Sequence, residues 1–290
     1  MPEPLTTLKA QKLCAAHLID TGCFGETQIL SRGESGVIAL SPGAGVLTLF
    51  LYPGCGASLS QSALEAFSLY QKAGLIRSVW MNGRAARLIG AAFPEALGAP
   101  RAVDMLLLRS EAFCPFPARE GIAFCLGAAA PSSDILELLR HAALSEGLPI
   151  TETDIRRAAK EDCASALCLM KDGRAVAMAR LMERHESTVR IGLVVTAPAY
   201  RGKGYGKAVV SRLAETILLE EGAPLSPRTD SYAQSAASAR QCYETALSAM
   251  PVGKPQYPVL FVRHDNIPAL RLYAALGFET VGTLTERTII

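Results

Sequence analysis

The chain has 290 residues, a nearly balanced charge and an apolar composition, which together exclude several classes of protein. Its 29 basic and 27 acidic side chains give a formal net charge of +2, which does not favour a nucleic-acid or anionic-membrane partner. Half of the residues are apolar, but no run approaches the ~18 to 20 residues of a membrane span, and the first residues do not resemble a signal peptide. We expect a globular, cytoplasmic monomer or homodimer.

The first 119 residues carry apolar patterns typical of an α/β domain. In chain order, the pattern predicts strands at 36–40 and 46–51 around a turn at 42–45, a helix at 60–72, a strand at 75–81, a helix at 84–92 and a strand at 103–108. Pro53-Gly54-Cys55-Gly56 follows the hairpin, but it carries no recognisable ligand motif. We therefore treat 1–119 as a separate N-terminal domain.

The second half begins with a similar alternation of elements. A strand is predicted at 121–127, helices at 134–144 and 154–159, and a hairpin of 166–170 with 175–181 around Asp172-Gly173. The next strand, 189–195, places Val189, Ile191, Leu193 and Val195 on one side if its alternation is regular.

A glycine-rich turn follows that strand and leads into an amphipathic helix. Residues 201–207 read Arg-Gly-Lys-Gly-Tyr-Gly-Lys. Glycines let phosphate oxygens approach the backbone, and the first turn of a helix offers unpaired N–H groups at the positive end of its dipole. The spacing fits neither a Walker loop nor a dinucleotide fingerprint, because Arg201, Ala208 and Lys207 stand where those motifs need other residues. A polyphosphate site is the favoured interpretation, and a plain strand-to-helix turn is the alternative.

A second group of residues follows a short apolar strand at 259–262. Asn266 is a good N-cap, Pro268 is tolerated in the first helical turn, and Gly277 is a typical helix terminator. Tyr273 lies two turns after Asn266 on the same helical face. A strand, a capped helix and a last strand at 279–285 are therefore expected, with Tyr273 offering a functional hydroxyl or only core packing.

These two groups of residues resemble the motifs of the GNAT N-acetyltransferase superfamily. Arg201, Gly204 and Gly206 match its Gln/Arg-x-x-Gly-x-Gly/Ala loop, and 266–278 match its Asn-x-x-Ala-x-x-x-Tyr-x-x-x-Gly-Phe pattern. The resemblance implies an α/β fold with a mixed sheet over 120–290. The sequence departs from the family order at about 223–257, where an inserted helix is expected that covers the acceptor site, extends an interface or only decorates the surface. It also implies that 1–119 is either a degenerate GNAT-like domain or an unrelated α/β domain.

The resemblance further implies transfer of an acetyl group from acetyl-CoA to a primary amine by direct attack. The acceptor is a small molecule or a peptide. The implied cofactor-binding residues are Leu193, Val194, Val195, Arg201, Gly202, Lys203, Gly204, Tyr205, Gly206, Lys207 and Asn266. Tyr273 is the expected proton donor to the departing thiolate, and Glu183 is chosen as general base over His185, His264 and Asp265.

No metal is expected, because neither the cysteines nor the histidines show ligand spacing. The eight cysteines contain no Cys-x-x-Cys pair and mostly have apolar neighbours, which favours buried reduced thiols. The alternative function is that of a catalytically silent acyl-CoA-binding regulatory or interaction protein, and a nucleotide-binding dehydrogenase is a weaker third possibility.

Overall fold

The computed structural model describes residues 5–20, 26–117, 121–146, 151–153, 155, 156, 159, 166–219 and 256–290. Its helices are α1 (Thr7–Asp20), α2 (Ala57–Lys72), α3 (Gly83–Ala92), α4 (Ser132–Glu146), α6 (Tyr205–Leu219) and α8 (Ile267–Ala274). Its strands are β1 (Gln28–Gly33), β2 (Gly36–Ser41), β3 (Val46–Leu51), β4 (Ser78–Asn82), β5 (Arg101–Leu107), β6 (Ala123–Leu126), β7 (Ala166–Lys171), β8 (Arg174–His185), β9 (Thr188–Thr196), β10 (Tyr257–Arg263) and β11 (Glu279–Thr288). The helix predicted at 154–159 lies partly outside the described residues, and the inserted helix at 223–257 lies almost wholly outside them.

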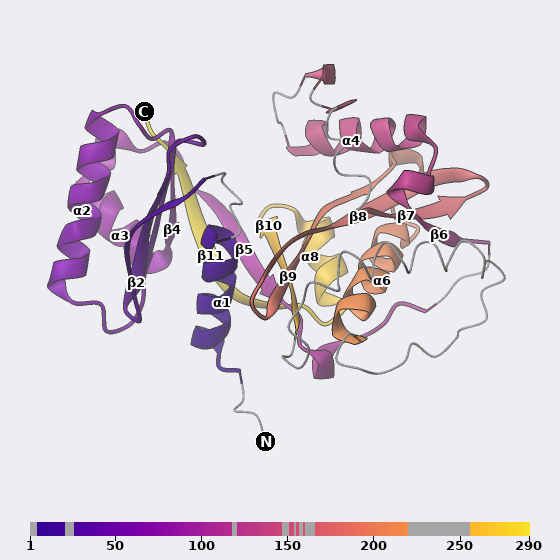
Figure 1. Ribbon diagram of the computed structural model, residues 1–290, viewed down its shortest axis with the longest axis horizontal. Coiled ribbons are helices and arrows are strands. Elements are labelled where there is room, and N and C mark those ends of the chain that lie inside the picture. Colours follow the sequence, from indigo (N-terminus) through magenta and orange to yellow (C-terminus); the bar gives the residue numbers. More distant parts are fainter. Residues whose placement is uncertain are drawn as a thin grey trace.

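Among the described residues, the strands form one continuous mixed sheet, with the order β1-β2-β3-β4-β11-β5-β10-β9-β8-β7-β6. The sheet twists along its length, so the first half lies at one end of the molecule and the second half at the other (Figure 1). The predicted α/β class with a mixed sheet is confirmed, as are the predicted strands and helices from β2 to β5 and from β6 to β11 that lie in the described residues.

The two halves of the chain repeat one order of elements. In the first half, β1, β2 and β3 form an antiparallel meander, α2 follows, β4 pairs parallel to β3, and α3 and β5 complete the unit. In the second half, β7, β8 and β9 form the meander, and α6, β10, α8 and β11 follow in the same order, with β10 parallel to β9. The order of elements therefore supports the interpretation of residues 1–119 as a GNAT-like unit over that of an unrelated domain.

The last strands of the two halves are exchanged. Strand β11 lies between β4 and β5, and β5 lies between β11 and β10, with all three pairings antiparallel. Each half thus completes its sheet with a strand from the other half, so the two share a hydrogen-bonded core. The boundary expected between residues 119 and 120 stays a prediction, and it falls between β5 and β6 in the chain.

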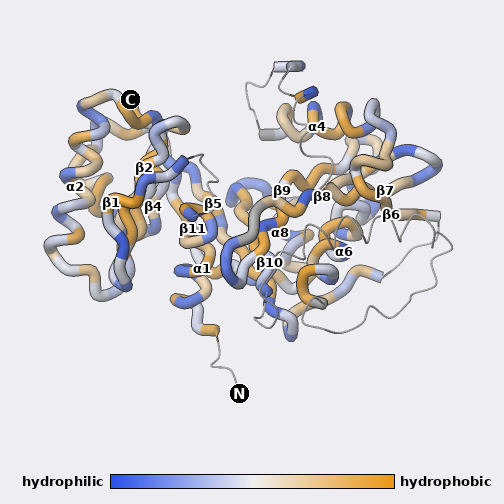
Figure 2. Tube along the Cα trace, viewed as in Figure 1, coloured by the Kyte–Doolittle hydropathy of each residue, from blue (hydrophilic) through white to orange (hydrophobic). Residues whose placement is uncertain are grey.

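Helices cover both faces of the sheet, and successive side chains of a strand pack against opposite helical layers. In β5, Leu106 packs in the cluster that contains α6 and α8, whereas Met105 and Leu107 pack in the cluster that contains α1. Helix α4 covers the α1 side of β7 and β8, where Met178 and Val195 are buried beneath it. The apolar stretches concentrate in the strands and on the inner sides of these helices (Figure 2).

The sequence patterns did not reveal helix α1 or strand β1. Helix α1 lies against the middle of the sheet and contacts β5, β8, β9 and β11 (Figure 1). Its packing face consists mainly of small or polar side chains, with Ala10, Cys14, Ala15 and His17 all buried, so its apolar periodicity is weak. Strand β1 is a mostly exposed edge strand, and an exposed strand has little apolar alternation to detect. No helix within the described part of the chain is long and apolar enough to cross a membrane.

Candidate active site

The parallel strands β9 and β10 separate part-way along their length. Their pairing joins Thr188 to Tyr257, Val189 to Pro258 and Arg190 to Val259. Over the rest of the two strands, which the structure describes completely, no further pair is formed. The β10-facing edge of β9 from residue 191 to 196 is therefore a row of backbone groups without a strand partner, which suits an extended amide-containing ligand.

A β-bulge interrupts β9 inside this open stretch. Arg180 of β8 pairs with Gly192 and Met178 pairs with Val195, so Leu193 and Val194 together face the single residue Ala179. Leu193 has a φ of +49°, in the left-handed region that a bulky residue rarely adopts.

The bulge also changes which side chains share a face of β9. Val189 and Ile191 pack in the α6 cluster, but Val195 is buried in the α4 cluster with Leu193 beside it. The prediction that all four side chains lie on one side is therefore wrong after Ile191, because one extra residue reverses the alternation.

The glycine-rich turn leads from β9 to α6 as predicted. The Arg201 Nε atom donates to the carbonyl of Thr196 at 3.2 Å, which holds the turn against the end of β9. Gly202 and Gly204 have φ values of +73° and +82°, so both positions favour glycine. The first helical bond at this end runs from Ala208 N to Gly204 O at 3.0 Å, and the amides just before Ala208 therefore have no acceptor within the helix.

Lysine side chains give the turn positive charge, and the side chains packed around it leave little free space. Lys203 extends along the turn, with Nζ 3.1 Å from the Ala199 carbonyl oxygen, and the Lys207 ammonium lies 5.4 Å from the ring centre of Phe116. A Cβ at Gly206 would lie 3.0 Å from the Thr196 hydroxyl, so there is little space for a side chain at this position. The turn combines backbone donors, a helix N-terminus and cationic groups, which is the chemistry of a diphosphate site.

The second predicted group of residues also has the expected local structure. The Asn266 side chain accepts from Ala269 N at 3.3 Å and caps α8, so its capping role is confirmed. Gly277 has a φ of +94°, and a Cβ there would lie 1.9 Å from the Ala112 carbonyl oxygen, so this position requires glycine. Leu272 of α8 packs at Gly206 of α6, which brings the two predicted motifs together in space.

Comparison with known proteins agrees with this geometry. Residues 133–244 match the sequence model of the acetyltransferase (GNAT) family. This part of the chain, from α4 through the glycine-rich turn, is therefore similar in sequence to GNAT acetyltransferases. No curated protein matches the sequence.

Solved GNAT structures share the fold over nearly the whole chain. A GCN5-related N-acetyltransferase from Kribbella flavida has a TM-score of 0.55 at 17% identity, with 97% of this chain and 95% of that chain covered. A GNAT-family acetyltransferase from Colwellia psychrerythraea has a TM-score of 0.53 at 14% identity, with 100% and 98% covered. A tandem GNAT protein from the clavulanic acid biosynthesis pathway has a TM-score of 0.51 at 15% identity, with 90% and 82% covered. At these identities the likeness establishes the fold alone.

The two predicted catalytic residues occupy different environments. Tyr273 is 6% exposed and packs in the core beneath α8, with its ring 5.9 Å from that of Phe278 in an edge-on contact. Glu183 lies in β8 near its end, and its side chain is outside the described part of the structure. Their assigned roles stay predictions.

The other residues considered as a base have identifiable partners. His185 Nε2 lies 3.1 Å from Asp20 of α1. His264 Nδ1 lies 2.7 Å from the buried carboxylate of Asp104, and Asp265 pairs with Arg263, which lowers the pKa of its carboxyl below the usual value. Each of these three side chains is therefore engaged with another charged group, and the choice of base stays a prediction.

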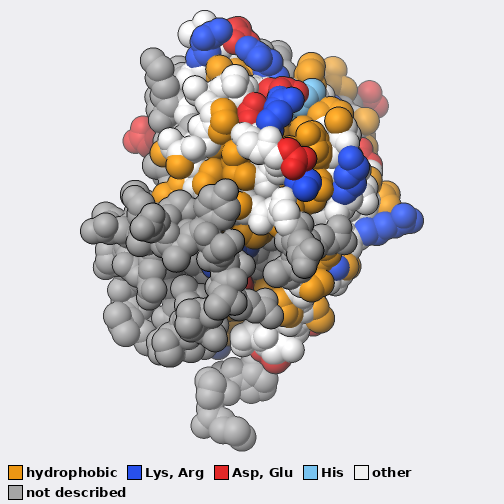
Figure 3. Space-filling model, turned by 90° about the vertical axis from the view of Figure 1, so that its right-hand side faces the viewer, with side chains coloured by type: hydrophobic (Ala, Val, Ile, Leu, Met, Phe, Trp, Pro, Cys, Tyr) orange, Lys and Arg blue, Asp and Glu red, His pale blue; other side chains and the backbone are white. Residues whose placement is uncertain are grey.

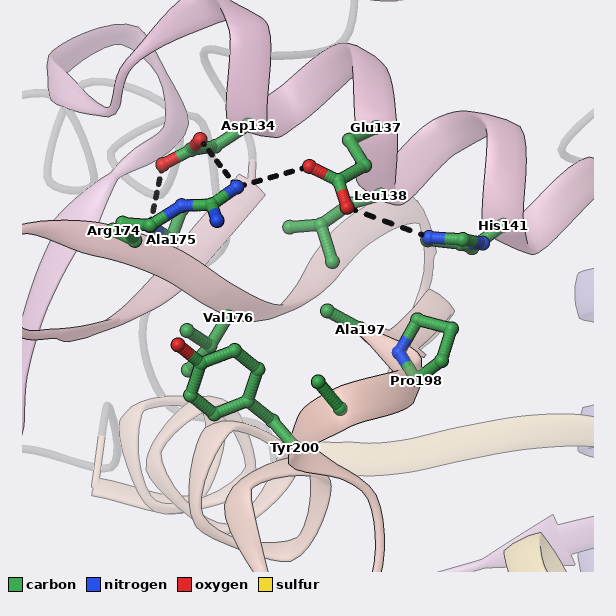
Figure 4. Close-up of a pocket in the computed structure, with 11 residues that line it drawn as sticks. Asp134, Glu137, Leu138, His141, Arg174, Ala175, Val176, Ala197, Pro198 and Tyr200 are labelled. Carbon is green, nitrogen blue, oxygen red and sulfur yellow. Dashed lines mark hydrogen bonds and ion pairs between the residues drawn. The ribbon is translucent and has the colours of Figure 1, made fainter.

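A pocket with a volume of about 290 Å³, which the sequence patterns did not indicate, lies beside the start of the glycine-rich turn. It is bounded by α4, the beginning of β8 and the segment from Ala197 to Tyr200 (Figure 4). Asp134 accepts from Ala175 N at 2.9 Å, and Arg174 bridges Asp134 and Glu137. This hydrogen bond and the two ion pairs of Arg174 join α4 to β8 along the wall of the pocket. Seen from the side of the second half, basic and acidic side chains are interspersed over the surface (Figure 3).

Proposed function

We propose that the protein is an N-acetyltransferase that moves an acetyl group from acetyl-CoA to a primary amine by direct attack. The observation that carries this proposal is the open edge of β9, with its bulge at Leu193 and Val194, running directly into the turn that begins at Arg201. An extended chain ending in a diphosphate matches both parts of this site at once.

The residues present fit such a ligand. Leu193, Val194 and Val195 supply backbone groups for the amides of the pantetheine arm, and the amides of Gly202 to Lys207 supply donors for the diphosphate. Arg201, Lys203 and Lys207 balance its charge. Asn266 caps α8, and we propose that it also contributes to cofactor binding. When bound, acetyl-CoA supplies an activated acyl group.

The remaining tasks are proton transfers by this chain's own side chains. Tyr273 is proposed to donate a proton or a strong hydrogen bond from its hydroxyl to the departing thiolate, which lowers the cost of its negative charge. A backbone N–H near the bulge is proposed to stabilise the charge that develops on the acyl oxygen. Glu183 is proposed to accept the proton of the amine, directly or through water.

We also propose the setting in which this reaction takes place. The protein acts in the cytoplasm as a monomer or homodimer on a small-molecule or peptide amine, without a metal, a nucleic acid or a membrane as partner. In the described part of the chain, no cluster of three or more His, Cys, Asp or Glu side chains is arranged to hold a metal ion. The second function to be tested is that of a catalytically silent acyl-CoA-binding protein, with the N-terminal half as the surface that contacts a partner.

A thiol-release assay separates these two functions. The protein is incubated with acetyl-CoA and a panel of primary amines, and free thiol and acetylated amine are both measured. Thiol release that depends on the amine supports the transferase. Tight binding of acetyl-CoA in calorimetry without turnover on a broad panel supports the silent binding protein, and absence of acetyl-CoA binding contradicts both.

A further inference from the structure

The pocket beneath α4 is separate from the proposed cofactor site. It has a volume of about 290 Å³ and lies between α4, the start of β8 and residues 197–200, which lead into the glycine-rich turn (Figure 4). The structure describes residues 188–207 completely, and none of the residues 191–196 or 201–207 lines this pocket. A ligand held here therefore leaves the open edge of β9 and the glycine-rich turn accessible.

One part of the pocket is apolar. Leu138 points down from α4, and Ala197 and Pro198 face it from the segment after β9 (Figure 4). Val176 of β8 adds a third side to this apolar lining. Ligand pockets are commonly lined in this way, with a few polar groups that fix the orientation of the ligand. The lining favours a ligand with a hydrocarbon part, because removal of that part from water is favourable.

The carboxylate of Glu137 is the first polar group on the wall. Its Oε2 atom accepts a hydrogen bond from Arg174 at 3.0 Å. Its Oε1 atom lies 3.6 Å from His141 Nε2, which is longer than a hydrogen bond. No described residue donates a hydrogen bond to Oε1, so this oxygen can accept one from a ligand.

The hydroxyl of Tyr200 is the second polar group on the wall. Tyr200 rises from the segment after β9 toward the start of β8 (Figure 4). Its ring contacts the Lys203 ammonium at 5.2 Å and the Tyr205 ring at 6.1 Å. Within the described part of the chain, however, its hydroxyl forms no hydrogen bond. A phenol oxygen can accept as well as donate, so it can bind the same N–H-rich group as Glu137.

The charges on the wall favour a cation. Asp134 and Glu137 contribute two carboxylates against the single guanidinium of Arg174. Asp134 is buried and already accepts from Ala175 N and Arg174, so Glu137 is the carboxylate that remains open to a ligand. Lys203 does not line the pocket, and its Nζ atom is 3.1 Å from a backbone carbonyl oxygen of the turn.

We propose that this pocket binds a primary alkylammonium ion. Its N–H groups donate to Glu137 Oε1 and the Tyr200 hydroxyl, and its chain lies against Leu138 and Pro198. An ammonium has three donors and no acceptor, and its hydrogen bonds to a carboxylate are charge-assisted. The site goes beyond the proposed function, because it is separate from the place where an amine would react and does not depend on turnover.

The position of the pocket links this site to the glycine-rich turn. The ligand would contact residues 197–200 directly, and the Arg201 side chain bonds the Thr196 carbonyl at the other end of this segment. A ligand that restrains the segment changes the free energy of arranging the turn for a diphosphate. We therefore expect the alkylammonium ion and coenzyme A to alter each other's affinity by the same factor.

A matched pair of probes tests the ligand class. Calorimetry measures the binding of n-pentylamine and of 1-pentanol to the wild-type protein without coenzyme A, near neutral pH, where the amine is protonated. The amine is expected to bind saturably and the alcohol about tenfold or more weakly, because only the ammonium forms charge-assisted hydrogen bonds. No saturable binding of the amine, or equal binding of the two probes, overturns the proposal.

Two substitutions locate the bound amine. Ala199 is exposed and lines the pocket, so Ala199→Phe fills it from a position that tolerates a larger side chain, and binding of the amine should be lost. Glu137→Gln keeps the shape of the side chain without its charge, and about tenfold weaker binding is expected. Ala91→Phe, at an exposed position of α3, and Glu215→Gln, on α6, are the matched controls. Wild-type affinity in both pocket variants would place the amine elsewhere and overturn the proposal.

A second titration tests the link to the turn. The Kd of n-pentylamine is measured with and without saturating coenzyme A, which carries no acyl group to transfer, and a change of about threefold or more is expected. An unchanged Kd overturns the link. Failure of coenzyme A to bind contradicts the proposed transferase function, whereas the comparison of the two probes still tests the pocket. Melting temperatures near that of the wild type show that the variants are folded.

Discussion

The two halves of the molecule share one order of elements, yet only the second half has an open site. In the first half, β3 and β4 pair from Val46 with Ser78 to Leu49 with Met81, almost to the end of both strands. The side chain of Asn82 then closes the gap, because it accepts from Leu51 N at 3.1 Å and donates to Leu51 O at 2.8 Å. A side-chain amide thus occupies the backbone groups that the second half leaves open.

The turns that follow the two strands differ in the same way. In the first half, Arg84 points its guanidinium at the carbonyls of Tyr52 and Cys55, so a cation is directed at backbone acceptors. In the second half, the corresponding turn offers backbone donors and carries Lys203 and Lys207. The comparison teaches that the same order of elements can form a ligand site or a closed structural unit. The outcome depends on whether a side chain or a ligand forms hydrogen bonds with the backbone groups where the two parallel strands separate. We propose that the first half is the closed unit.

The largest expected effect comes from a matched pair of glycine substitutions. Gly204 and Gly54 both have left-handed φ values, +82° and +86°, and each lies in the turn of its half. Gly204→Val is expected to weaken acetyl-CoA binding about hundredfold or more, because two or more charge-assisted hydrogen bonds to the diphosphate are lost. Gly54→Val carries similar backbone strain but leaves the affinity unchanged, as measured by calorimetry. An equal loss in both variants would place the site elsewhere.

The next effect concerns turnover at Tyr273. Tyr273→Phe is expected to lower kcat about hundredfold while acetyl-CoA affinity changes by less than about threefold, because only the proton donor is removed. Tyr52→Phe is the control, since Tyr52 is similarly buried in the first half, at 4% exposure. Wild-type activity of Tyr273→Phe across pH on a competent acceptor would show that the ring only packs in the core.

Two helix-capping asparagines, one in each half, are expected to differ in their effects on the free energy of unfolding and on acetyl-CoA binding. Asn82 caps α3 through Ala85 N and bonds both backbone groups of Leu51, whereas Asn266 caps α8 through Ala269 N. Asn82→Ala is expected to cost about 2 to 3 kcal/mol of unfolding free energy with no change in acetyl-CoA affinity. Asn266→Ala should cost about 1 kcal/mol and weaken acetyl-CoA binding. Denaturant unfolding and calorimetry measure both, and the reverse pattern would assign the ligand to the first half.

The last prediction concerns the pH dependence of stability, which involves His17 at the junction between the halves. His17 is buried with Nδ1 2.8 Å from the Thr188 hydroxyl, and its pKa falls from the ordinary value of 6.5 to about 3. Between these values the unfolded chain binds a proton that the folded chain does not, so stability falls as the pH drops from 6.5 toward 3, by about 1.4 kcal/mol per pH unit. His17→Gln should flatten this part of the curve. An unchanged slope would contradict the neutral, buried state of His17.

The sequence patterns correctly predicted those turns and helix ends whose conformation depends only on neighbouring residues in the chain. The turn at Gly204 and the helix from Asn266 to Gly277 follow from φ preferences and capping that neighbouring residues determine. The exchange of β5 and β11 was not predicted, because strand order depends on pairings between residues far apart in the chain. The bulge at Leu193 was missed because one extra residue leaves no mark in an apolar run.

Hydrogen exchange with and without coenzyme A tests the central claim most directly. We expect the ligand to slow exchange of amides over residues 191–207 and at the start of α8, and to leave 51–57 and 82–85 in the first half unaffected. Slowed exchange in the first half, or no protection at 191–207 at saturating coenzyme A, would contradict the assignment of one open site to the second half.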